Sequence, residues 1–495
     1  MLQLLQGDTF FTDVFAFNSL AVPNSSGHWL MAGLLTIFSP EIVSKITITI
    51  CFALFTASVI WLRAATAGRE DLEVVTAFAV AIAFNWLWMQ GSYNYVLGLA
   101  GSTFALGLFY KWREKLDAKY TALLSLLVVF VYLGHLISFA MLVGSVLVLA
   151  AFAKENRKAL TSVCIALIPC IPLLIAYKSV SASGETLMPA WRTLTDATSV
   201  SAWAVQMLYA DPFAIISRRS VPFYNGSSVY FFAFSPVIWI ALAAIMMLAA
   251  TLLNVRDSRE KLRGRLPFIL LSAACLGAAL FGPDDFGLTN GSILRERMLI
   301  ASLIFFVPVV DLKGHRRLKI AAHICLIFVV AFQTAALWDY SISSDAETRE
   351  FINARQVIPE GASVASVVVL EDPLRFHAAP VAQSTNYLGV GRNVIVWDNY
   401  ELGHYMFPIV TKSPSDKEFV FGLTTSNLFY LKDAKDNFDN KLNDLDAVLT
   451  SNHDRIDYIV VYGDRPRLSV VLGKWYDLHP IYQSGPVRVL ARSSL

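Results

Sequence analysis

Long apolar runs, separated by short polar connections, fill the first two-thirds of the 495-residue chain. A helix needs about 20 mostly apolar residues to cross a bilayer, because the hydrocarbon core cannot satisfy an open backbone. One run, 121–153, is too long for a single crossing and is interrupted by Gly134 and His135, so it is interpreted as two shorter helices. The pattern predicts about ten transmembrane helices, at 42–62, 74–90, 94–110, 121–153 (two), 160–177, 230–253, 266–282, 298–310 and 318–338.

Lysine and arginine gather in every second connection between these runs, and the alternate short connections hold only Arg295 and Arg297. Cytoplasmic loops are the basic ones, so the residues before 42, the connection 178–229 and everything after 339 are predicted to face outside. An outer N-terminus without a signal peptide predicts one more apolar helix encoded upstream of Met1; translocation of the N-terminal tail without such a helix is the alternative.

Hydrophobicity falls sharply after residue 340, where the pattern changes from apolar runs to short alternating elements. Helices are predicted at 345–357 and 437–449, and β-branched strands at 363–370, 393–397, 457–462 and 487–491. We therefore expect three parts: an outer segment 1–41 with a short interfacial or re-entrant helix, a transmembrane domain 42–339, and an extracytoplasmic α/β domain 340–495.

Composition agrees with this division, since 56% of the residues are hydrophobic and only 16% are charged. The net charge of +2 argues against nucleic acid as a partner. All five cysteines lie in apolar stretches, so neither a disulfide framework nor a Cys/His metal spacing is present in the sequence. We predict no metal ligands and no cofactor, and leave dependence on a divalent metal open.

Acidic residues near the start of the chain are the first candidates for chemistry. Asp8 and Asp13 lie in GDTFFTD, on the predicted outer face. A carboxylate there could act as a general base toward a hydroxyl acceptor, or be an ordinary solvated acid or helix cap.

Several further polar residues are predicted at the outer membrane surface. His28 lies in PNSSGHWL and His135 between two half-length helices; either could bind a phosphate or an acceptor, or be structural. Asn94 lies in GSYNYVLG, where it could instead cap a helix. His404 and Glu401 lie in WDNYELGHYMF, where they could touch an acceptor or belong to a surface loop.

Arg295 and Arg297 lie in a predicted outer loop, although the other short outer loops contain no basic residue, and they directly precede an apolar run. Arginine makes bidentate contacts to phosphate, and lipid phosphates lie at this depth. Pairing with Asp284 or Asp285 is the alternative. We predict that Arg297, His28, His135 and Asp13 line one pocket, covered by the domain after residue 340.

The layout resembles the GT-C class of polyprenyl-phosphate-dependent membrane glycosyltransferases. The segments PNSSGHWL, GSYNYVLGLA, YLGHLISFAMLV and ILRERMLIASLIFF look similar to stretches in uncharacterised bacterial membrane proteins of this type. The resemblance implies that a carboxylate of the first outer loop is the catalytic base, for which Asp8 and Asp13 are the candidates. It also implies that basic residues at the outer surface hold the lipid phosphate.

These features predict a multi-pass protein of the inner (plasma) membrane that moves a sugar from a polyprenyl-phosphate donor to an outer acceptor, in cell-envelope polysaccharide synthesis. Its expected partners are the polyprenyl-phosphate-linked sugar and membrane lipid, and its oligomeric state stays open. A polysaccharide polymerase or flippase-like protein, or a non-catalytic scaffold whose outer domain binds a partner, are the alternatives. The predicted helices hold few ionisable residues, which argues against a coupled carrier.

Overall fold

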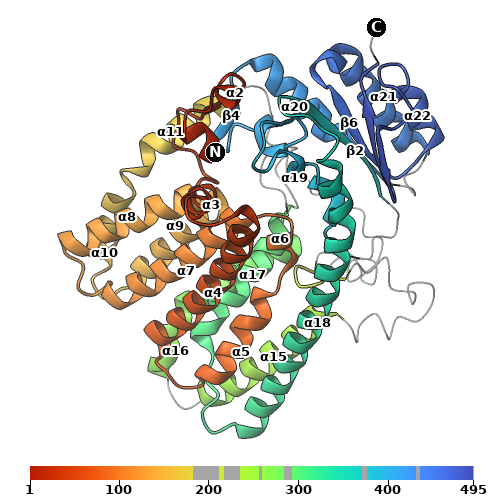
Figure 1. Ribbon diagram of the computed structural model, residues 1–495. Coiled ribbons are helices and arrows are strands. Elements are labelled where there is room, and N and C mark those ends of the chain that lie inside the picture. The colour runs from red at the N-terminus through yellow and green to blue at the C-terminus, as the bar shows by residue number, and fades with distance from the viewer. Residues whose placement is uncertain are drawn as a thin grey trace.

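A helical bundle carries a smaller sheet-containing domain at one end in the computed structural model (Figure 1). The structure describes residues 1–181, 211–216, 235–255, 259–283, 293–370, 376–430 and 435–493. Most of the predicted outer connection 178–229 lies outside these ranges, as do Asp284 and Asp285.

The bundle helices are α3 (Ser26–Leu35), α4 (Pro40–Ala67), α5 (Leu72–Ala83), α6 (Trp86–Met89), α7 (Tyr93–Trp112), α8 (Ala118–Gly134), α9 (Leu136–Ala151), α10 (Asn156–Leu167), α11 (Cys170–Ser181), α15 (Pro236–Val255), α16 (Arg259–Phe281), α17 (Leu294–Phe306) and α18 (Arg316–Ala354).

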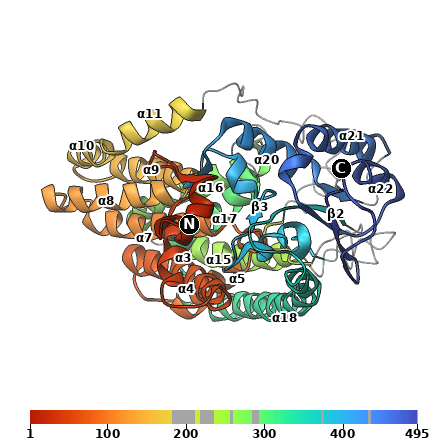
Figure 2. The same cartoon turned by 45° about the horizontal axis from the view of Figure 1, so that its top comes forward.

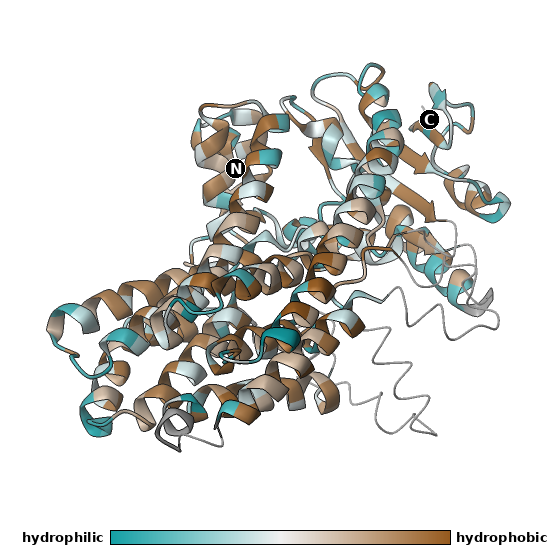
Figure 3. Ribbon diagram, turned by 90° about the horizontal axis from the view of Figure 1, so that it is seen from below, coloured by the Kyte–Doolittle hydropathy of each residue, from teal (hydrophilic) through white to brown (hydrophobic). Residues whose placement is uncertain are grey.

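Every predicted apolar run coincides with one of these helices or with a closely spaced pair, but fewer than ten are long and apolar enough to cross a membrane. Among the described residues five helices qualify by length and composition, or six if the pair α10 and α11, bent by 48°, is one broken span. The others fall short for visible reasons. Helices α8, α9 and α17 have 17, 16 and 13 residues, and α7 begins with the polar Tyr-Asn-Tyr. Figure 3 shows the apolar residues concentrated along the bundle helices.

The predicted break in the long run 121–153 is confirmed. Helix α8 ends at Gly134 and α9 begins at Leu136, so His135 ends one helix and starts the next. The glycine has a packing role, because a Cβ at Gly134 would lie 2.9 Å from the Cα of Gly98 in α7. Two glycines thus let α7 and α8 approach backbone to backbone where the chain turns.

Helix α18 differs from the prediction, which expected one helix at 318–338 and another at 345–357. The structure has a single helix of 39 residues, Arg316–Ala354. Its sequence contains neither glycine nor proline, so nothing ends the helix where hydrophobicity falls. The change in composition therefore marks a change of environment along one helix, which leads from the bundle to the sheet domain (Figure 1).

The C-terminal domain is built on a mixed sheet in the order β3-β2-β6-β8-β7, with β5 also pairing with β2. Strands β3, β5 and β6 run parallel to β2, while β8 is antiparallel to β6 and β7. The predicted strands 363–370 and 487–491 are confirmed with the same bounds, whereas β5 and β7 were not predicted. The strands are β2 (Ser363–Leu370), β3 (Ile395–Val396), β5 (Leu428–Tyr430), β6 (Tyr458–Tyr462), β7 (Tyr482–Ser484) and β8 (Val487–Ala491).

Strand β2 is buried along its whole length because helices cover both faces of the sheet. Ala365, Val367 and Val369 share a core with α20 (Pro414–Ser426), α21 (Lys435–Asn452) and α22 (Pro466–Leu472). Val364 and Val368 share the opposite core with Phe351 near the end of α18. Figure 2 shows α21 and α22 beside the sheet, away from the bundle.

The first seventeen residues pack with the C-terminal domain, far from it in sequence. They form α1 (Leu2–Leu5), α2 (Thr9–Thr12) and β1 (Phe15–Phe17). Strand β1 pairs antiparallel with β4 (Ile409–Thr411), and Phe11 and Phe15 enter the core that contains Trp397. The chain then enters the bundle at α3, so the first residues of the chain lie beside the segment that holds β4.

Candidate functional site

A polar contact joins the bundle to the C-terminal domain where α3 meets the 3-10 turn η5 (Tyr400–Gly403). His28 Nε2 lies 2.7 Å from Glu401 Oε2. On the other side of the ring, His28 Nδ1 lies 2.9 Å from the carbonyl oxygen of Asn24 and 3.2 Å from Asn94 Nδ2. Asn94 Oδ1 in turn accepts a hydrogen bond of 2.6 Å from Gly27 N, which holds the first turn of α7 against α3.

These partners let His28 change its protonation state without releasing Glu401. A carbonyl oxygen requires a proton on Nδ1, whereas the Asn94 amide nitrogen can donate only to a bare Nδ1. In both states Nε2 keeps its proton and donates to the carboxylate. Burial opposes the charged ring, but the Glu401 carboxylate and the hydrogen bonds outweigh it and hold the pKa of His28 above its ordinary value.

Arg297 lies in the first turn of α17, and its side chain is buried against the ring of Tyr95. The residue is 7% exposed, and its Cζ lies 4.8 Å from the ring centroid, a cation–π contact. Tyr95 OH donates to Arg297 O at 3.4 Å. Among the described residues, Arg297 Nε has no hydrogen-bond partner. A buried guanidinium nitrogen without a partner is costly, and an anionic group would satisfy it.

His135 completes a row with Tyr95 and Arg297. The rings of Tyr95 and His135 meet edge to face with centroids 5.2 Å apart, and Ser138 Oγ donates to Tyr95 O at 3.3 Å. Three helices, α7, α9 and α17, therefore begin at this place. Helix N-termini carry partial positive charge, so they add to the positive field around Arg297.

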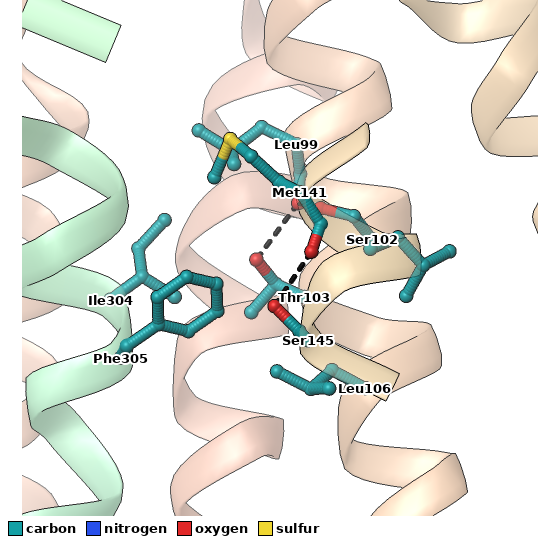
Figure 4. Close-up of a pocket in the computed structure, with 9 residues that line it drawn as sticks. Leu99, Ser102, Thr103, Leu106, Met141, Ser145, Ile304 and Phe305 are labelled. Carbon is teal, nitrogen blue, oxygen red and sulfur yellow. Dashed lines mark hydrogen bonds between the residues drawn. The ribbon is translucent and has the colours of Figure 1, made fainter. Parts of the chain in front are cut away.

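A small apolar pocket lies between the same three helices, further along them than this row. Its volume is about 10 Å³, which is room for about one water molecule. Figure 4 shows Thr103 and Ser145 donating to the backbone of their own helices, to Leu99 O at 2.8 Å and Met141 O at 2.6 Å. With these hydroxyls satisfied, the walls are mostly apolar: Leu99, Ser102, Thr103, Leu106, Met141, Leu142, Ser145, Ile304 and Phe305.

The structure thus brings together four of the residues singled out from the sequence: His28, Asn94, His135 and Arg297. We call these four, with Tyr95 and Glu401, the junction cluster. Tyr95 was not predicted, because an aromatic residue at the expected membrane surface is typical of an aromatic belt. Its position next to Asn94 was the only sequence signal.

The two acids of the first segment lie on the C-terminal domain's side of the molecule. Asp8 caps the short helix α2 by accepting from Phe10 N at 3.0 Å, and Asp13 is exposed at the end of that helix. Neither has a contact with the junction cluster in the part of the chain that the structure describes.

Arg295 lies apart from the junction cluster, whereas His404 borders it, because His404 N donates to Glu401 O at 3.2 Å and its ring packs on Tyr400 with centroids 4.0 Å apart. Arg295 turns away from Arg297 and donates to Ala279 O at 3.1 Å and Leu280 O at 3.4 Å, at the end of α16. His404 is buried in the C-terminal domain, where Nδ1 lies 2.7 Å from Tyr400 O and the ring packs on Phe421.

Comparison with known proteins gives the following. No family model matches the chain, and no curated protein is similar to it. Two solved structures are similar, both of ArnT from Cupriavidus metallidurans. The form bound to undecaprenyl phosphate has a TM-score of 0.41 and 12% sequence identity, and the apo form has 0.39 and 11%. Each alignment covers 99% of this chain and 91% of the ArnT chain.

Proposed function

We propose that this chain is a GT-C-type membrane glycosyltransferase that moves a sugar from a polyprenyl-phosphate donor to an acceptor on the outer face of the inner membrane, in cell-envelope polysaccharide synthesis. One observation carries the proposal: a buried arginine, whose Nε has no hydrogen-bond partner among the described residues, lies where three helices with apolar facing residues begin. A charge at the end of apolar helices suits a ligand that joins a phosphate to a hydrocarbon chain.

Arg297 is the proposed phosphate ligand. Its planar guanidinium can donate two parallel hydrogen bonds to phosphate oxygens, and Tyr95 fixes its plane from below. The isoprenoid units nearest the phosphate would then lie along α7, α9 and α17, against Leu99, Met141 and Ile304. His135, whose ring also meets Tyr95, would lie beside the phosphate. Arg295 would act indirectly, because its hydrogen bond to Ala279 O fixes the end of α16 against α17.

Sugar transfer requires that the acceptor hydroxyl lose its proton while the bond between C1 and the phosphate oxygen breaks. The lipid phosphate leaves with one more negative charge, which Arg297 would stabilise. The bases predicted from the sequence are Asp8 and Asp13, and both stay candidates. His28, Asn94 and His404 stay candidates for contacts to the acceptor.

The first test measures binding of radiolabelled undecaprenyl phosphate to the full chain in lipid nanodiscs. Arg297→Ala should weaken binding about 10- to 100-fold, because a hydrogen-bonded charge pair contributes about 1.5–3 kcal/mol. Arg297→Lys should recover part of the affinity, since it keeps the charge but loses the fork. Arg349→Ala, which removes an exposed arginine from α18, is the matched control and should bind normally.

Unchanged binding in Arg297→Ala would remove this residue from the phosphate site. The same preparations separate the alternative functions. A polymerase or flippase-like protein would bind the lipid phosphate without releasing sugar from a polyprenyl-phosphate monosaccharide, and a scaffold would do neither.

A further inference from the structure

Glu401 is the carboxylate that the fold brings to the junction cluster, although it lies 373 residues from its partner His28. Only Oε2 is engaged: Oε1 has no hydrogen bond in the described residues, and 40% of the side chain is exposed. One oxygen is held and the other is open to a bound molecule.

The sheet domain holds the Glu401 backbone in place from two sides. Asn399 Oδ1 accepts from Glu401 N at 3.1 Å and caps the turn η5. The preceding residue, Asp398, is buried and accepts a hydrogen bond from Ser366 Oγ in the middle of strand β2. The turn is therefore anchored to the centre of the sheet. The Glu401 carboxylate is positioned by this turn on one side and by His28 of α3 on the other.

Contacts also connect Glu401 to the proposed phosphate site. His28 touches Asn94, whose neighbour Tyr95 packs on Arg297. From the C-terminal domain, the Phe407 ring packs on His28 and on Tyr400, with centroids 6.0 and 6.4 Å away. Glu401 and Arg297 thus border the same end of the bundle, with Tyr95 and Asn94 between them.

We propose that Glu401 is the general base of the transfer and that His28 is its positioning residue; this inference rests on the function proposed above. Glu401 Oε1 takes the proton of the acceptor hydroxyl as the acceptor oxygen bonds to C1 of the sugar. The bond from C1 to the phosphate oxygen breaks, and its electron pair leaves with the lipid phosphate. The proton on Glu401 then passes to solvent, so charge and atoms balance.

His28 serves this step by holding Oε2. The imidazole donates from Nε2 whether Nδ1 is bare or protonated, so the carboxylate keeps its orientation through the proton transfer. Neither acid of the first segment is held by a histidine in this way. The side chain of Asp8 caps α2, and Asp13 lies at the exposed end of that helix. The base is thus supplied by the C-terminal domain, which makes docking of that domain a condition for turnover.

The experiment compares two acceptors that differ in whether they need a base. The full chain in nanodiscs receives undecaprenyl-phosphate glucose, mannose, galactose or arabinose, with either water or sodium azide as acceptor. Water must lose a proton to attack C1, whereas azide attacks without one. Glu401→Gln should lower sugar release to water at least about 100-fold, the usual contribution of a general base, while glycosyl azide forms at the wild-type rate.

His28→Gln should lower the water reaction less than Glu401→Gln does, with no loss of undecaprenyl phosphate binding. Glu418→Gln, an exposed acid on the neighbouring helix α20, is the matched control and should behave as the wild type. Normal binding of undecaprenyl phosphate by Glu401→Gln shows that this variant is folded.

Three results would overturn the inference while leaving the proposed function intact: Glu401→Gln keeps its water reaction, azide fails to restore its turnover, or only Asp8→Asn or Asp13→Asn loses the water reaction. The proposed function itself fails differently. In that case the wild-type chain neither binds undecaprenyl phosphate nor releases any of the four sugars.

Discussion

At the scale of single residues, the contact between His28 and Glu401 makes the molecule sensitive to pH. The pKa of His28 is raised above 6.5 in the folded chain, because the carboxylate and the hydrogen bonds outweigh burial. A group whose pKa is raised by folding contributes stability that is complete below its ordinary pKa and is lost as the pH rises through the folded value. The charge on His28 therefore stabilises the junction at pH 6, and this contribution falls as the pH rises through the raised pKa of His28.

This predicts the behaviour of His28→Gln. The difference in thermal midpoint between the wild type and this variant should be largest near pH 6 and should shrink steadily toward pH 9, in nanodiscs at fixed ionic strength. His479→Gln, at an exposed histidine of the C-terminal domain, controls for titration elsewhere. A difference that is constant or grows with pH would show that the imidazolium charge contributes nothing to docking.

At the scale of elements, the close crossing of α7 and α8 decides where His135 lies. The crossing depends on Gly98 and Gly134: a Cβ on Gly98 would come within 3.1 Å of His135 N, and one on Gly134 within 2.9 Å of Gly98 Cα. Because backbone atoms cannot rotate away, any larger residue must move a helix. The position of His135 next to Tyr95 therefore depends on glycine at both 98 and 134.

Gly134→Ala should destabilise the bundle by about 1–3 kcal/mol, as overpacking does in tight cores. It should also weaken undecaprenyl phosphate binding, since His135 shifts from Tyr95. The control is Gly144→Ala in α9, where no atom lies within 4 Å of the added methyl group; it should be neutral or stabilising by about 0.5–1 kcal/mol. Both effects are measured as shifts of the thermal midpoint, and equal shifts in the two variants would refute a crossing held by glycine.

At the scale of the whole molecule, α18 relates the C-terminal domain to the membrane. With 39 residues it is about 58 Å long at 1.5 Å per residue, enough to cross a hydrocarbon core of about 30 Å and continue beyond it. Its first residues include Arg316, Arg317 and Lys319, and its other end packs on the sheet. The basic end is typical of a cytoplasmic boundary, so we predict that the sheet domain lies outside.

Reporter fusions test this orientation. Fusions after Arg263 and Arg316 should report the cytoplasm, and fusions after Ser201 and Ser493 the outside, because an odd number of crossings must separate Arg316 from Ser493. Agreement at all four positions supports the four crossings predicted after Ser201, since one missing helix among them reverses the order. Fusions after Arg316 and Ser493 in the same compartment would contradict both the topology and the outer site.

Local patterns of the sequence were enough to locate most elements. The apolar runs marked the bundle helices, the pair Gly134 and His135 marked the break between α8 and α9, and β-branched runs marked β2 and β8 with their observed bounds. Each of these features is decided by residues that are close together in the sequence. A run of apolar residues marks a helix or strand that is buried, and a glycine followed by a polar residue marks the place where a helix ends. The continuity of α18 was missed because composition changes inside a helix that nothing interrupts.

Only the tertiary structure decided which polar residues share a site. Arg295 and Arg297 have nearly the same local sequence, yet two residues on a helix differ by about 200° in direction, so one holds α16 and the other faces Tyr95. Likewise, no local pattern joins Glu401 to His28, or β1 to β4. Such contacts arise from how helices rotate and how distant segments pack, which depends on the whole chain at once.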